Sequence, residues 1–181
     1  MPPVSVRDLR IQAREHDLIV ATHGRGIWIL DDISPLEQMA ATKEESVHLF
    51  PSRLATRWHY YGFIENLGDA TYKAKNPAYG AYINYYIDAD PSEVVKLEIA
   101  DKSGQIIRTL NDSSAKWGLN RIVWDLRAEG ATPMNNPITS GWRSGPYRPK
   151  VVPGTYTATL YANGEKPSTE IEVLAAPRAE M

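Results

Sequence analysis

The sequence predicts an all-β protein, an antiparallel β-sandwich preceded by a short β-meander. Three observations predict this fold class. Short runs of residues alternate apolar and polar side chains with a period of two, turn-forming residues separate these runs, and no stretch has the periodicity of a long helix. The expected parts are a meander over residues 1–33, a connector over 34–79, the sandwich over 80–175 and a flexible tail over 176–181.

The meander is expected from three short extended runs. Residues 6–11 and 18–22 form the first two, and residues 27–30 form the third. Residues 23–26, with the sequence His-Gly-Arg-Gly, supply a tight turn because glycine accepts positive φ angles. A lone meander exposes too much apolar surface to be stable unsupported, so it must pack on something. We therefore predict a homo-oligomer that forms through residues 1–33.

The connector has a weaker pattern. Residues 34–40 predict one or two helical turns, with Ser34 as the N-cap and Glu37 at the third position of a capping box. An aromatic segment follows at residues 57–61, and a loop then runs to Gly80. We interpret this stretch as a connector that lies over the sandwich.

The sandwich is expected from a series of short strands with turn residues between them. In the expected strand over residues 118–126, Ile122, Trp124 and Leu126 fall on one face, which places Trp124 in the predicted core. Several short strands with no helix of convincing length favour a sandwich. The expected strands cover residues 82–87, 95–99, 106–110, 118–126, 155–161 and 169–173.

Two parts of the chain resemble known families. The segment DLIVATHGRGIWILDD, residues 17–32, resembles the last blade of sortilin-like β-propellers with bacterial-neuraminidase-type repeats, which are often labelled glycosyl hydrolases. Four segments of the predicted sandwich together resemble the immunoglobulin-like domain of the flagellar hook-capping type, which recurs at the C termini of many bacterial secreted proteins: residues 95–99, 103–110, 118–125 and 153–156.

The resemblance implies an immunoglobulin-like sandwich after a propeller blade. A propeller carries four to eight blades, and this chain has room for less than one. The chain thus looks like the C-terminal end of a longer exported or periplasmic protein, and any function of the missing blades is not carried over. Residues 22–28 resemble the Asp-box turn of neuraminidase repeats, but Gly24 replaces the aspartate and Trp28 comes one position early. We interpret this segment as a structural turn.

Composition and charge limit the possible partners. The 181 residues include 20 Lys and Arg against 22 Asp and Glu, and this net charge of -2 disfavours a nucleic-acid partner. No apolar run approaches the ~20 residues that cross a bilayer. The absence of cysteine excludes disulfides and thiolate metal sites. Residues 1–5 do not look like a signal peptide, so the chain is expected to be either cytoplasmic or a piece of a longer secreted protein.

No residue constellation predicts catalysis, a metal or a cofactor. Asp31 and Asp32 are adjacent in an extended segment, so their carboxylates point to opposite faces and are expected to be solvated. Glu98 and Asp125 are the conceivable glycosidase pair, but Glu98 lies on the polar face of its strand and Asp125 directly follows a core Trp. The sequence has no Gly-x-Ser-x-Gly motif, and the histidines at 16, 23, 48 and 59 lack metal-type spacing.

Two segments suggest binding. Residues 131–150 lack strand periodicity and acidic side chains, and long irregular loops in compact domains are usually functional or disordered. Aromatic rings beside arginines suit a carbohydrate or protein ligand. The alternative is that these rings cover the sandwich edge. The candidate binding residues are Trp142, Arg143, Tyr147 and Arg148, together with Trp58 and Tyr60 from the aromatic segment.

These patterns favour a non-catalytic accessory or interaction module. The alternative function is a small hydrolase acting on glycosidic or ester bonds, which is suggested by the label that the resembled propeller proteins carry.

Overall fold

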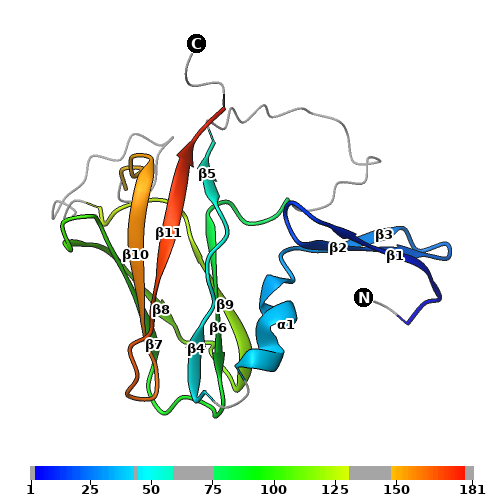
Figure 1. Ribbon diagram of the computed structural model, residues 1–181, viewed down its shortest axis with the longest axis horizontal. Helices are drawn as coiled ribbons and strands as arrows, with labels where there is room; N and C mark the ends of the chain where they lie inside the picture. The colour runs from blue at the N-terminus through cyan, green and yellow to red at the C-terminus, as the bar shows by residue number, and fades with distance from the viewer. Residues whose placement is uncertain (1–2, 43–44, 59–75, 131–147, 178–181) are drawn as a thin grey trace, which may run out of the picture. The chain divides into compact units, whose positions relative to one another are not determined.

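The computed structural model has an all-β fold, as the sequence predicts (Figure 1). Helical structure in the described residues is confined to α1 (Ser34–Gln38) and the 3-10 turn η1 (Met39–Ala41). The chain divides into two compact units, Met1–Glu45 and Ser46–Met181, which are described separately below. The structure describes residues 3–42, 45–58, 76–130 and 148–177.

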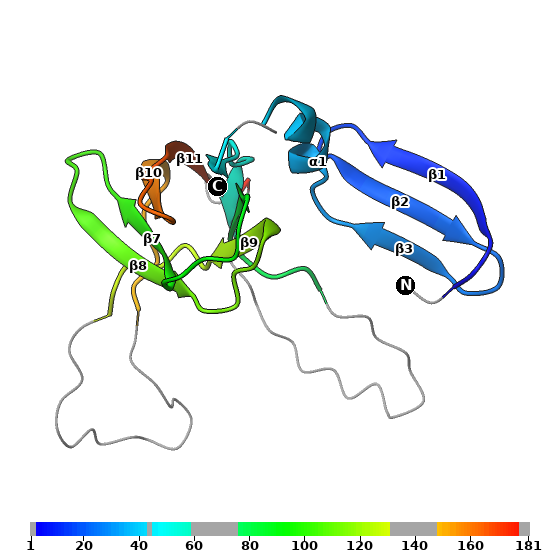
Figure 2. The ribbon, with the colours of Figure 1, turned by 90° about the horizontal axis from the view of Figure 1, so that it is seen from below.

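The first unit contains the predicted meander (Figure 2). Strands β1 (Val6–Gln12), β2 (Asp17–Thr22) and β3 (Ile27–Leu30) pair antiparallel in that order. The turn between β2 and β3 is confirmed, because Gly24 and Gly26 have φ angles of 71° and 77°. The backbone N–H and the hydroxyl of Thr22 both donate to the Gly26 carbonyl, at 3.2 and 2.6 Å, and close the turn.

Helix α1 confirms the predicted helical turn, but the predicted cap is wrong. The N-cap is Ile33, and no side chain forms a cap hydrogen bond. Ser34 instead donates from its hydroxyl and its backbone N–H to the carboxylate of Asp32, at 2.6 and 3.3 Å. This carboxylate is also buried, so the expectation that Asp32 is solvated is wrong. The wrong cap and the wrong exposure of Asp32 have one cause, because the Ser34 hydroxyl that a capping box needs donates to the Asp32 carboxylate instead.

The second unit is a sandwich of two sheets. The five-stranded sheet has the order β5-β11-β10-β7-β8, and the three-stranded sheet has the order β4-β6-β9. All six expected strands are present, and they correspond to β6 through β11. The strands are β4 (Val47–Leu49), β5 (Ala55–Arg57), β6 (Ala81–Ile87), β7 (Val95–Ala100), β8 (Ile106–Asp112), β9 (Gly118–Trp124), β10 (Gly154–Tyr161) and β11 (Ser168–Ala175).

The sandwich begins inside the stretch interpreted as a connector. Strand β4 pairs antiparallel with β6, and after Pro51 the chain crosses to the other sheet, where β5 pairs parallel with β11. The five-stranded sheet is therefore mixed rather than purely antiparallel. These two strands have only three residues each, which is too short for an alternating pattern to be recognised in the sequence.

The core of the sandwich is built around Trp124. Its ring is fully buried and packs edge-on against Tyr156, with ring centroids 5.3 Å apart. The indole N–H donates to the Arg127 carbonyl at 2.9 Å, which satisfies its only polar atom. The Tyr156 hydroxyl donates to the carbonyl of Val152, four residues upstream, at 2.7 Å. Such a tyrosine corner at this position is a hallmark of immunoglobulin-like sandwiches. The predicted inward face is confirmed by the burial of Ile122, Trp124 and Leu126.

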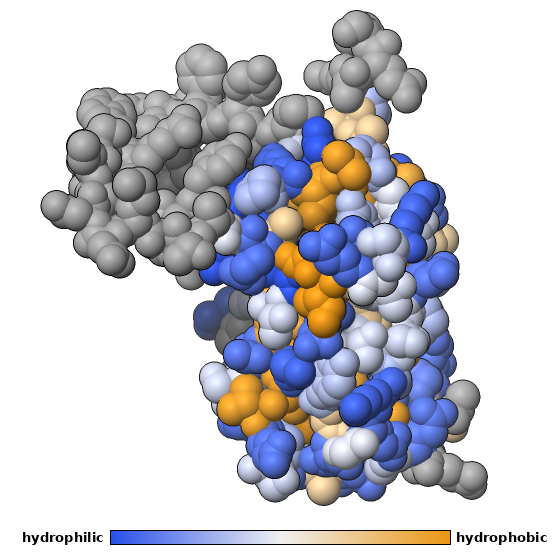
Figure 3. Space-filling model, turned by 90° about the vertical axis from the view of Figure 1, so that its left-hand side faces the viewer, coloured by the Kyte–Doolittle hydropathy of each residue, from blue (hydrophilic) through white to orange (hydrophobic). Residues whose placement is uncertain are grey.

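The outer face of the five-stranded sheet is polar. On β10 the inward-facing core residues alternate with Thr155, Thr157 and Thr159, and the last two pair across the sheet with Glu170 and Ser168 of β11. Figure 3 shows the side of the molecule that carries β7 and β8, where hydrophilic surface predominates between narrower hydrophobic patches. This distribution is the one expected of a sandwich that buries one face of each sheet.

Candidate functional site

Strands β5 and β9 end, and β6 and β10 begin, at the same end of the sandwich, which we call the loop end (Figure 1). The candidate binding residues predicted from sequence belong to the two segments that join β5 to β6 and β9 to β10. Trp58 and Arg148 lie at the loop end, and Tyr60, Trp142, Arg143 and Tyr147 lie outside the described residues. The described part of the loop end consists of residues 57–58, 79–80, 125–129 and 148–151.

Side chains of the loop end clamp the two segments together. The Lys150 ammonium donates to the Trp58 carbonyl at 3.0 Å and lies 5.4 Å from the centroid of the Tyr79 ring. The Arg57 guanidinium donates across the same gap to the Val151 carbonyl at 2.9 Å. Segments that are 92 residues apart in the sequence are therefore tied at their bases. The structure thus brings together the ends of two candidate regions that are far apart in the sequence.

The loop end presents an aromatic ring and basic groups to solvent. Trp58 is 50% exposed, so part of its ring is open to solvent. The Arg148 guanidinium is partly exposed and lies 3.8 Å from the Glu129 carboxylate. Arg127 donates to the Arg148 carbonyl, so its guanidinium holds the backbone of the second segment. The exposed groups are therefore attached to backbone segments that hydrogen bonds hold together.

Burial raises the pKa of the Tyr79 hydroxyl, and the neighbouring guanidinium groups of Arg57 and Arg127, together with a hydrogen bond to the Trp58 backbone, offset this only in part. The hydroxyl therefore stays protonated near neutral pH. One carboxylate oxygen of Asp125 is buried and makes no hydrogen bond within the described part of the chain.

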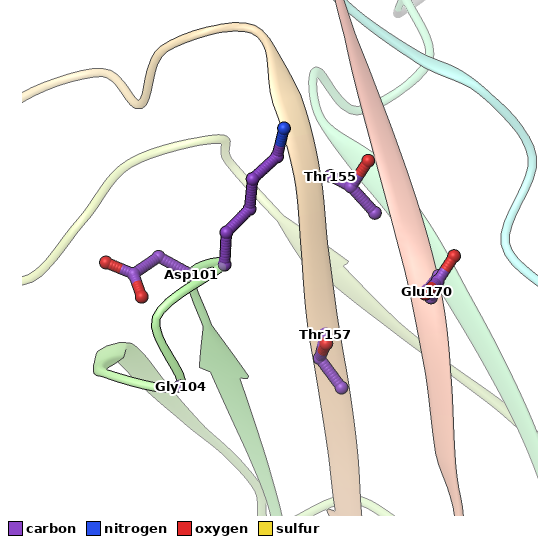
Figure 4. Close-up of a pocket in the computed structure, with 6 residues that line it drawn as sticks. Asp101, Gly104, Thr155, Thr157 and Glu170 are labelled. Atoms are coloured by element: carbon purple, nitrogen blue, oxygen red, sulfur yellow. The ribbon is translucent and has the colours of Figure 1, made fainter.

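A hollow of about 420 Å³ lies beside the loop end, on the outer face of the five-stranded sheet (Figure 4). In Figure 4 the side chains of Thr155 and Thr157 stand on β10 beside Glu170 of β11. The turn after β7 closes the other side, where the hydroxyl and backbone of Ser103 donate to the Asp101 carboxylate and hold its pKa below the usual range. The lining residues are Asp101, Lys102, Gly104, Thr155, Thr157 and Glu170.

A second hollow, of about 490 Å³, lies at the opposite end of the same sheet. Tyr161 is its aromatic residue, and the ammonium groups of Lys96 and Lys166 lie 4.2 and 5.3 Å from the ring centroid. The Tyr161 hydroxyl and Lys96 both donate to the Glu98 carboxylate, at 2.8 and 3.0 Å. These bonds lower the pKa of Glu98, so it is a fixed anion and not a proton donor near neutral pH. Because Lys96 and Lys166 both lie against the Tyr161 ring, that ring is less accessible to a ligand than the Trp58 ring at the loop end.

The structure separates the residues considered for catalysis. Glu98 is on the outer face of the five-stranded sheet, and Asp125 follows β9 of the three-stranded sheet. The Asp32 carboxylate is bound by Ser34. Among the described residues, no three His, Asp or Glu side chains are close enough to hold a metal ion. No helix in the described ranges is both long and apolar enough to cross a membrane.

The sequence does not show the polar hollow beside the loop end. The alternation of Thr155 and Thr157 with core residues does mark an outward polar face. That alternation does not show that the turn carrying Lys102 lies beside it, because this depends on the pairing of β7 with β10. Comparison of the chain with protein-family models, curated proteins and solved structures found no match. The functional interpretation therefore depends on the geometry of the chain itself.

Proposed function

We propose that the sandwich is a non-catalytic binding module that takes a carbohydrate at the loop end. The observation that carries this proposal is the clamp between Lys150 and Trp58, which gathers two aromatic and basic segments at one end of a rigid core. Immunoglobulin-like sandwiches bind through loops clustered at one end, because a packed core holds the loop bases in place while the loop sequences vary.

The groups at the loop end favour a carbohydrate with acidic substituents over a protein partner. The neighbouring hollow is lined by hydroxyl, carboxylate and ammonium groups, including Thr155, Thr157 and Lys102, which exchange hydrogen bonds readily with sugar hydroxyls. The half-exposed Trp58 ring supplies a stacking surface for a sugar. Protein-binding hot spots, by contrast, centre on well-packed desolvated anchors. The basic groups of Lys150 and Arg148 favour a uronic acid or a sulfated sugar at the loop end, whereas Asp101 and Glu170 of the hollow suit the neutral hydroxyls of the adjoining sugar.

An accessory role agrees with the separated carboxylates and with the sequence resemblance. Glycosidase chemistry needs two carboxyl groups facing one cleft, and Glu98 and Asp125 belong to different sheets. The resemblance to exported propeller proteins supports a module that holds a saccharide for a larger protein. Turnover of chromogenic glycosides or esters that a single carboxylate substitution abolishes would contradict the non-catalytic proposal.

Affinity electrophoresis tests the proposal. The full chain is run through gels containing an acidic polysaccharide such as alginate, or a neutral one such as dextran. We expect retardation by alginate, and we expect Trp58→Ala to weaken it about fivefold to tenfold, since stacking on an aromatic ring contributes about 1 kcal/mol. Trp117→Ala is the matched control, because Trp117 is 67% exposed and precedes β9 at the opposite end. Equal weakening by both substitutions, or no retardation in any gel, contradicts the proposal.

A further inference from the structure

A buried guanidinium contacts the loop end of the sandwich. Arg108 of β8 pairs in register with the core residue Ile99 of β7, so its side chain points to the inner face of the five-stranded sheet. Only 8% of this side chain is exposed. Charged side chains are rarely buried to this extent unless an anion accompanies them. Arg108 therefore marks a place in the fold that needs a negative charge beside it.

The carboxylate of Glu129 supplies this charge, and the ion pair is unequal. Nη1 of Arg108 donates to both carboxylate oxygens of Glu129 at 3.2 Å. The Glu129 side chain is 59% exposed, so water hydrates the carboxylate while the guanidinium is almost fully withdrawn from water. Separation would cost the carboxylate little, because solvent takes over its hydrogen bonds, but it would leave Arg108 buried without a counter-charge. The fold thus requires an anion at this position, but that anion need not be Glu129.

The guanidinium of Arg108 also has a donor that Glu129 does not use. Arginine binds an anion most strongly when two of its nitrogen atoms each donate to a different oxygen. Both bonds to Glu129 come from Nη1, and the buried Nε–H has no hydrogen-bond partner within the described residues. Buried donors are normally satisfied, so this position suits an anion whose oxygens can be placed more freely than those of a tethered side chain.

A second guanidinium and a fixed backbone surround the same carboxylate. Nη2 of Arg148 lies 3.8 Å from a carboxylate oxygen of Glu129, which is within ion-pair range but too long for a hydrogen bond. The Glu129 backbone N–H donates to the Ile107 carbonyl at 2.6 Å, and the Ala128 N–H donates to the Pro149 carbonyl at 3.0 Å. The Glu129 side chain can therefore turn into solvent while the backbone around it stays bonded.

We propose that the acidic group of the ligand displaces the Glu129 side chain and binds between Arg108 and Arg148. The group is a carboxylate or a sulfate, since guanidinium groups bind carboxylates and tetrahedral oxyanions with paired hydrogen bonds. The site rests on the carbohydrate proposed for the loop end, and it supplies the side chains that recognise the ligand's negative charge. Arg148 is two residues from Lys150, which donates to the Trp58 carbonyl, so extended backbone puts the two contacts about 7 Å apart. One short oligosaccharide can reach both.

Affinity electrophoresis in alginate gels measures the competition by Glu129. Glu129→Gln removes the competing charge and is expected to strengthen retardation about threefold to fivefold, the range of an ion pair with a solvated carboxylate. Glu93→Gln is the matched control, because it removes the same charge from an exposed residue at the opposite end of the sandwich, and it is expected to leave retardation unchanged. Retardation that Glu129→Gln leaves unchanged or weakens overturns the displacement of Glu129, although it still supports carbohydrate binding.

Nuclear magnetic resonance of the Arg108 side chain separates displacement from a simple loss of repulsion. The full ¹⁵N-labelled natural chain and Glu129→Gln are each titrated with inorganic sulfate, with sodium chloride at equal ionic strength as the control. The Arg108 Nε–H resonance is expected to shift along a saturable curve in both chains, and at lower sulfate in Glu129→Gln.

The two measurements fail independently. A saturable shift at Arg108 without retardation in any gel supports the anion site and contradicts carbohydrate as its ligand. No sulfate-specific shift at Arg108 in either chain overturns the anion site, and the natural chain provides this test even where Glu129→Gln does not fold.

Discussion

The hydrogen bond between Tyr85 and Asp112 ties the two sheets of the sandwich together. Tyr85 is a fully buried residue of β6 in the three-stranded sheet, and its hydroxyl donates to the Asp112 carboxylate of β8 in the five-stranded sheet at 2.7 Å. Burial alone would raise the pKa of Asp112, but the hydrogen bonds from Ser114 and Tyr85 outweigh it and lower this pKa. Burial, followed by the bond to Asp112, raises the pKa of Tyr85, so the phenol remains a donor.

Tyr85→Phe removes this bond and keeps the ring in the core. A hydrogen bond to a charged group contributes about 1.5–3 kcal/mol, and Asp112 keeps its bonds from the Ser114 hydroxyl and N–H, at 2.7 and 2.9 Å. We therefore expect the free energy of unfolding at pH 7 to fall by about 2 kcal/mol. Because folding lowers the Asp112 pKa, the contribution of its carboxylate is complete above the unfolded pKa of about 4 and is lost as the pH falls through the folded pKa.

Urea unfolding of both proteins between neutral and acidic pH measures this prediction. The difference between the natural chain and Tyr85→Phe is expected to shrink as the pH falls through the folded pKa of Asp112. Tyr156→Phe is the control, because the Tyr156 hydroxyl donates to the neutral carbonyl of Val152. Its loss is expected to cost about 1 kcal/mol at every pH. The reasoning is refuted if Tyr85→Phe costs less than about 0.5 kcal/mol, or if its effect is as independent of pH as that of Tyr156→Phe.

Three further predictions concern the core and the division of the chain. Trp124→Ala is expected to destabilise the sandwich by about 3–5 kcal/mol in urea unfolding, and a loss below about 1 kcal/mol contradicts the core described here. Gly80→Ala is expected to lower the free energy of unfolding by about 4 kcal/mol or more, because a Cβ there would lie 2.0 Å from the Trp124 carbonyl oxygen. Gly104→Ala is its control: a Cβ there meets nothing within 4 Å, so only the positive φ angle should destabilise the fold, by about 1 kcal/mol. Deleting residues 1–45 should leave a cooperatively unfolding sandwich by circular dichroism, since its buried core cluster contains no residue from that unit; a non-cooperative transition rules this out.

The sequence predicted most of the sandwich because six of its strands carry strong local patterns. In β7, Val95, Leu97 and Ile99 alternate with polar residues and are all buried. Local patterns could not predict β4 and β5, whose pairing partners β6 and β11 follow much later in the sequence. Arg108 is another surprise, because it is buried on β8 and contacts the exposed Glu129 carboxylate. Only the folded neighbourhood supplies a partner that lets such a charge be buried.

The candidate site was predicted only in part, because it too depends on contacts between residues that are far apart in the sequence. The sequence shows that Trp58 and Arg148 belong to segments without strand pattern, but the meeting of these segments depends on the crossing of the chain from one sheet to the other. In the sequence Lys150 is only a basic residue at the end of the second segment, whereas in the structure its ammonium donates to the Trp58 carbonyl and joins the two segments. The self-association predicted for residues 1–33 remains a prediction.

Carbohydrate binding at the loop end is tested most directly by a nuclear magnetic resonance titration of the full ¹⁵N-labelled chain with an acidic oligosaccharide such as trigalacturonate. The indole N–H of Trp58 and the backbone N–H groups of Lys102 and Thr155 are expected to shift together along one saturable curve. Trp117 and Tyr161, at the opposite end of the sandwich, are expected to stay unchanged. Shifts confined to Tyr161 and its neighbours, or no saturable shift at Trp58, would contradict the proposed site.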